Sequence, residues 1–109
     1  MSIIYCDGLI LFYNSVMASS VDYLEYVLDL LREVDGVTYI KMMGEYIFKR
    51  YNVIFGGLYD NRFLVKKTSK NAKYEMHEAI PYPGGKPMYL VDTEDSELIR
   101  EIVLDSLPT

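Results

Sequence analysis

The chain has 109 residues, of which 50% are hydrophobic and 14% aromatic, so it can bury the core of one domain and is not a disordered segment. Its formal net charge of −5 argues against a surface built for nucleic-acid phosphates, and no tight direct binding of DNA is expected. The single cysteine, Cys6, excludes an intramolecular disulfide and favours a cytoplasmic location, and no apolar stretch reaches the roughly 18 residues that span a membrane.

Residues 1–16 form an apolar N-terminal extension with one charged side chain, Asp7. A secretory signal is not expected, because the extension lacks Lys and Arg and Asp7-Gly8 interrupts its apolar run. The segments Ile3–Cys6 and Leu9–Tyr13 around that Asp-Gly pair predict a short hairpin. So apolar a segment is expected to pair with a sheet edge, in the same chain or in a twofold-related partner, which makes a homodimer the expected assembly.

The domain itself is expected to span residues 17–109 and to open with an amphipathic helix. Ser19 and Ser20 are candidate N-caps, and Asp35-Gly36 is a typical end of a helix. Between them, apolar residues recur at the helical spacing of three and four: Leu24, Val27, Leu28 and Leu31.

Four strand-like segments follow and predict an antiparallel meander. They are Val37–Met42, Glu45–Arg50, Asn52–Tyr59 and Arg62–Lys66, separated by residues that favour tight turns. Gly56-Gly57 inside the third strand predicts a β-bulge or a close packing contact.

The remainder predicts a helix, a strand and a final helix. Thr68 or Ser69 caps a helix that reaches about Ala79, and the Pro- and Gly-rich loop that follows leads into a strand over Lys86–Val91. Asp92 or Thr93 is expected to cap the last helix, whose buried stripe comprises Leu98, Ile99, Ile102 and Val103.

Residues able to perform catalysis are few. His77 is expected on a helix surface beside Glu75 and Glu78, without the further ligands that a metal site needs. Cys6 has no basic neighbour in sequence to lower its pKa, and Gly84-Gly85-Lys86 lacks the full phosphate-cradling motif. No nucleophile–base pair is visible, so the sequence predicts a protein that is not an enzyme and has no cofactor or metal.

Several short segments occur in an order that resembles a known family. They are Met17–Ser20, Met42–Tyr46, Val53–Leu58, Phe63–Lys66 and Lys86–Tyr89. Together they resemble the N-terminal domain of the TfoX/Sxy competence-regulator family, here as a stand-alone domain. The resemblance implies a small α+β domain of a kind also seen in secretion-chaperone-like proteins, and a role in competence or transcriptional regulation.

We therefore expect an α+β fold in the order α-β-β-β-β-α-β-α, with helices on one face of an antiparallel meander. The expected function is that of a non-enzymatic regulatory or adaptor domain acting through contacts with a protein partner. The alternative is a small-molecule-binding domain with a pocket near Met42, Met43 and Tyr46.

Five basic side chains and no acidic one lie between Arg62 and Lys73, which is typical of a solvated face. The candidate ligand or partner surface comprises Met42, Met43, Gly44, Tyr46, Arg62, Lys66 and Lys67.

Overall fold

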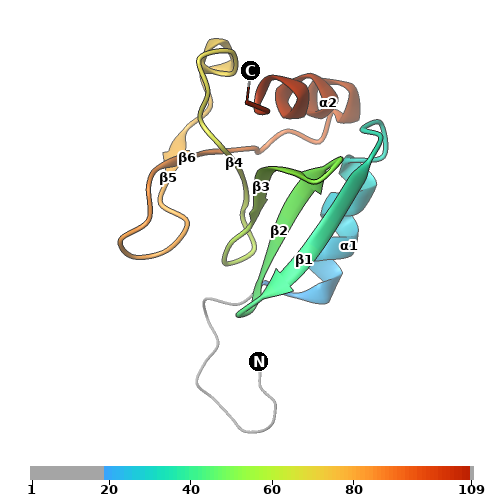
Figure 1. Cartoon of the computed structure of the whole chain (residues 1–109), viewed down its shortest axis with the longest axis vertical. Helices are drawn as coiled ribbons and strands as arrows, with labels where there is room; N and C mark the ends of the chain where they lie inside the picture. Colours follow the sequence, from blue (N-terminus) through green and yellow to red (C-terminus); the bar gives the residue numbers. More distant parts are fainter. Residues whose placement is uncertain (1–18, 109) are drawn as a thin grey trace, which may run out of the picture.

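The computed structural model describes residues 19–108, so the predictions for residues 1–16 lie outside the described part of the chain. The described part is an α+β domain (Figure 1), which confirms the predicted fold class. Its elements are α1 (Val21–Leu30), β1 (Val37–Met42), β2 (Glu45–Arg50), β3 (Val53–Leu58), β4 (Phe63–Val65), a 3-10 helix (Ala72–Tyr74), β5 (Glu78–Ala79), β6 (Met88–Leu90) and α2 (Ser96–Asp105).

The strands form one antiparallel sheet in the order β1-β2-β3-β4-β6-β5. The first four make the predicted meander. The chain then leaves the sheet and returns as β5 and β6, of which β6 pairs with β4 and β5 lies outside it. Within the described residues, β1 and β5 are therefore the two edges of the sheet.

Helix α1 begins where the sequence predicted. The hydroxyl of Ser20 caps it by accepting a 3.0 Å hydrogen bond from the N–H of Tyr23, a contact that satisfies one of the free N–H groups of the first turn. Leu24, Val27 and Leu30 are buried, whereas Leu28 is only half-buried. The apolar stripe thus extends over almost two turns of the helix and faces the sheet, with Leu28 at its margin.

The prediction of a helix between Thr68 and Ala79 is wrong. That segment forms a turn, the short 3-10 helix and strand β5. The cause is the side-chain amide of Asn71, which is fully buried. It forms hydrogen bonds with backbone groups that would pair with other backbone groups in a continuous helix. Its Oδ1 accepts from Thr68 N–H at 2.9 Å, and its Nδ2 donates to the carbonyl of Lys66 at 2.7 Å and to Ser106 Oγ at 2.9 Å.

Helix α2 starts later than predicted. Asp95 is its N-cap, and its carboxylate accepts hydrogen bonds from the N–H groups of Glu97 and Leu98. Thr93, one of the two predicted caps, instead accepts a bond from the N–H of Asp95. The predicted buried stripe is confirmed for Ile99, Ile102 and Val103.

Both helices pack on one face of the sheet and share a single core with it (Figure 1). At the centre of that core, Phe48 stacks on Phe55 with ring centroids 6.0 Å apart and meets Phe63 edge-on at 5.8 Å. Side chains alternate along a strand, so the neighbours of these core residues, such as Ile47 and Ile54, lie on the opposite face. We call that second face the open face. Neither helix of the described chain has the length and apolar character needed to cross a membrane.

Candidate functional site

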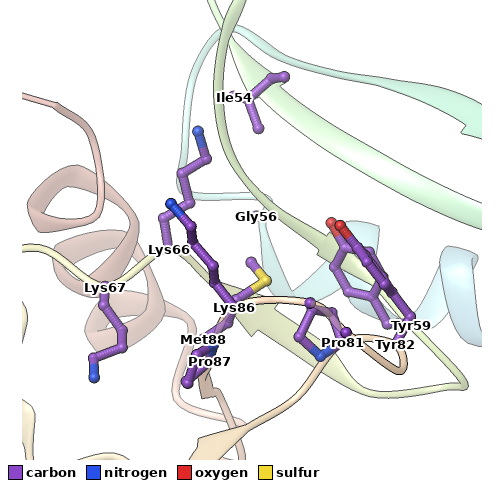
Figure 2. Close-up of a pocket in the computed structure, with 12 residues that line it drawn as sticks. Ile54, Gly56, Tyr59, Lys66, Lys67, Pro81, Tyr82, Lys86, Pro87 and Met88 are labelled. Atoms are coloured by element: carbon purple, nitrogen blue, oxygen red, sulfur yellow. The ribbon is translucent and has the colours of Figure 1, made fainter.

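A groove of about 640 Å³ lies on the open face, between the β3–β4 hairpin and the segment that joins β5 to β6 (Figure 2). Strand β3 and the residues that directly follow β3 and β4 supply its floor, and the joining segment supplies its outer wall. Its lining residues are Ile54, Gly56, Tyr59, Lys66, Lys67, Pro81, Tyr82, Gly84, Gly85, Lys86, Pro87 and Met88.

Arg62 holds the two sides of the groove together. Its guanidinium donates to the carbonyl of Tyr59 at 3.0 Å, to that of Ile80 at 3.0 Å and to that of Pro81 at 3.2 Å. These bonds tie the β3–β4 turn to the start of the outer wall. The ring of Tyr82 is thereby held near that of Tyr59, with centroids 6.2 Å apart.

The floor of the groove depends on the absence of a side chain at Gly56. A Cβ at this position would lie 2.2 Å from the carbonyl oxygen of Leu64 and 2.9 Å from Cα of Val65, which is closer than atoms can approach. The register between β2 and β3 also shifts between Phe48 and Lys49, so that Phe55 is the extra residue. The predicted bulge and the predicted close contact are both present.

The charge of the lining is entirely positive. Lys66, Lys67 and Lys86 contribute three ammonium groups, and no lining residue is acidic. Lys67 is bound to Glu78 at 2.7 Å and lies over the ring of Tyr89. Lys66 and Lys86 form no ion pair within residues 19–108, and in Figure 2 their side chains extend in the same direction while Lys67 points away.

The hydroxyl of Tyr59 stays protonated at neutral pH. Burial, and to a smaller extent the charge of Glu45 and the neighbouring Tyr82, raise the pKa of Tyr59 to about 12. A neutral phenol can donate a hydrogen bond to an oxygen or nitrogen acceptor. The tyrosine end of the groove is therefore an aromatic wall that carries a hydrogen-bond donor.

The residues of the predicted ligand or partner surface fall into three groups. Lys66 and Lys67 line the groove. Met42 and Met43 lie at the β1–β2 turn with exposed fractions of 51% and 95%, outside the groove lining. Three others serve the fold: Gly44, whose carbonyl accepts from Ser19 N–H; Tyr46, which is buried in the core; and Arg62, which is bound to three carbonyls.

Sequence reasoning missed the tyrosines and the second lysine of the groove. Tyr59 and Tyr82 are 23 positions apart, and Lys66 and Lys86 are 20 apart. They meet because β6 pairs with β4, with Leu64 opposite Leu90. The motif Gly84-Gly85-Lys86 was the available indication, although taken alone it lacks the full phosphate-binding pattern.

A second hollow, of about 430 Å³, lies beside α1 and has the opposite character. Asp92 and Glu94 line it together with Tyr23 and Tyr26. The hydroxyl of Tyr26 donates to a carboxylate oxygen of Glu94, and this bond raises the pKa of Tyr26. Two of its polar groups, the Tyr26 hydroxyl and the Glu94 carboxylate, are thus already bonded to each other.

Comparison with known proteins yields no relative: no family model, no curated protein and no solved structure matches the chain. Within residues 19–108, there is no group of three or more His, Cys, Asp or Glu side chains that could hold a metal ion.

Proposed function

We propose that this chain is a non-enzymatic regulatory or adaptor domain that acts through protein–protein contacts. The observation that carries the proposal is the exposure of β1, where every residue after Val37 is exposed. On the open face, Ile40 and Met42 are 41% and 51% exposed, and Ile54 on β3 is 38% exposed. We call Ile40, Met42 and Met43 the β1 surface.

Two physical properties make the β1 surface suited to a protein partner. An edge strand presents unpaired N–H and C=O groups to which another strand can bind. Exposed apolar side chains gathered in one place gain free energy when a partner covers them, and the flexible thioether of methionine adapts to partners of different shape. Strand addition in a twofold arrangement leads us to propose a homodimer.

The resemblance to TfoX/Sxy N-terminal domains supports competence or transcriptional regulation as the process. It rests on segments of this sequence, and three of them contribute to the groove. Val53–Leu58 supplies Ile54 and Gly56, Phe63–Lys66 supplies Lys66, and Lys86–Tyr89 supplies Lys86, Pro87 and Met88.

The experiment compares wild-type protein with a variant carrying Ile40→Ser and Met42→Ser. Val21→Ser is the matched control, since Val21 is an exposed apolar residue on α1. Light scattering gives the oligomeric state, and crosslinking in native extract followed by mass spectrometry identifies partners. We expect the double variant to lose self-association and its crosslinked partner while the control keeps both. Equal behaviour of the two variants would contradict the proposal.

A second candidate function is small-molecule binding, and the groove is the observation that favours it. Its volume of about 640 Å³ falls within the range of ligand pockets, roughly 300–1,000 Å³. We therefore assign this candidate function to the groove lined by Tyr59, Lys66, Tyr82 and Lys86, and not to the methionines of the β1–β2 turn.

A further inference from the structure

We propose that the groove binds a small organic phosphate with a planar ring, of the size of a mononucleotide. In this arrangement the phosphate lies between the ammonium groups of Lys66 and Lys86, and the ring packs against Tyr59 and Tyr82. The inference deepens the small-molecule candidate above and is independent of the β1 surface.

The charge of the ligand follows from the lysines. Lys66 and Lys86 extend in the same direction along one side of the groove (Figure 2), and no carboxylate of the lining or ion pair of the described residues neutralises them. Two like charges repel each other until an anion is placed between them. A phosphate with close to two negative charges compensates both ammonium groups, whereas a single carboxylate compensates one, and lysine is a common phosphate ligand.

The planar ring follows from the other side of the groove. The rings of Tyr59 and Tyr82 lie 6.2 Å apart with a tilt of 51°, and Pro81, Pro87 and Met88 continue the apolar surface. Aromatic side chains stack on the faces of planar rings, and this stacking does not depend on which polar groups the edge of the ring carries. The protonated hydroxyl of Tyr59 adds one donor for a ring or sugar acceptor.

The size of the ligand follows from the volume of the groove and the net charge of the protein. A volume of about 640 Å³ admits a mononucleotide. A polynucleotide would extend beyond the groove over a molecule of net charge −5, which repels further phosphates. At the wall, a Cβ on Gly84 would meet no atom within 4 Å, so there is open space beside the site.

The test uses the full chain and three probes: adenosine 5′-monophosphate, adenosine and inorganic phosphate. Binding is followed by amide NMR shifts and calorimetry at two salt concentrations. The variant carries Lys66→Met and Lys86→Met, which retain the length of the side chains. The control carries Lys41→Met and Lys70→Met, which change the net charge equally outside the groove lining.

We expect the monophosphate to shift the amides of groove residues and to bind the Lys66/Lys86 variant at least roughly tenfold more weakly, a difference of about 1.4 kcal/mol. Higher salt should weaken the binding to wild type. If adenosine binds as tightly as its monophosphate, or the control loses as much affinity as the variant, the phosphate inference is wrong while small-molecule binding stands. If no probe shifts the groove amides at millimolar concentration, both are wrong.

Discussion

The two faces of the sheet are made by the same strands and yet differ in nearly every property. On the helix-covered face, Phe48, Phe55 and Phe63 have exposed fractions of 0–1%. On the open face, Ile40, Met42 and Ile54 are exposed, and a basic groove replaces the packed helices. The alternation of side chains along a strand thus separates a face that supplies stability from a face that is available for binding. Substitutions on either face can test that separation.

The largest expected effect is on the covered face. Phe55→Ala removes a fully buried ring that stacks on Phe48 and should lower the free energy of unfolding by about 3–5 kcal/mol. Leu28→Ala should cost less, about 1–2 kcal/mol, because Leu28 only borders the core. Urea melts measure both. His77→Ala is the control, since His77 is exposed, and a greater loss for His77→Ala than for Phe55→Ala would invert the assignment of the faces.

The next effect concerns Asn71, which connects the end of β4 to α2. Asn71→Ala leaves the buried Ser106 hydroxyl and the carbonyl of Lys66 without the amide donor, which should cost about 2–3 kcal/mol. The neighbouring exposed residue gives the control, Ser69→Ala. Thermal melts compare the two variants, and an unchanged midpoint for Asn71→Ala would show that this contact does not hold α2 to the covered face.

What the sequence predicts well is local. Ser20 caps α1 through a bond three residues away, and the turn pairs Tyr51-Asn52 and Asp60-Asn61 adopt the positive φ values that tight hairpins require. The error at residues 68–79 has a distant cause, because Asn71 bonds to Ser106, 35 positions away. The groove was missed for the same reason, since Lys66 and Lys86 meet only after β6 has paired with β4.

A smaller effect is expected at low pH, at Asp35 in the connection between α1 and β1. The hydroxyl of Tyr51 and then the guanidinium of Arg50 bond to Asp35 and lower its pKa from 3.8 to about 2. In the folded state this carboxylate therefore remains ionised at a lower pH than in the unfolded state. Its contribution to stability is complete above about pH 4 and is lost as the pH falls from about 4 to 2.

Asp35→Asn should remove that part of the pH dependence, so the stability of the variant should fall less steeply between pH 4 and 2. Asp105, whose pKa is lowered mainly by the hydroxyl of Tyr74 and also by Lys73, acts in the same direction and is retained in both proteins. Urea midpoints measured at intervals through this range compare variant and wild type. Parallel curves would show that the Asp35 contacts do not persist in solution.

The smallest effect on stability is expected on the open face. Met42 is about half exposed and belongs to an edge strand, so Met42→Ser removes few packed contacts and should change the free energy of unfolding by no more than about 0.5 kcal/mol. The same substitution removes an apolar side chain from the β1 surface and should weaken self-association, because burial of that side chain contributes to the contact. Urea melts at low protein concentration give the first quantity, and sedimentation at several concentrations gives the second. Loss of stability without loss of association would mean that Met42 belongs to the core after all, and the open face would begin only at the groove.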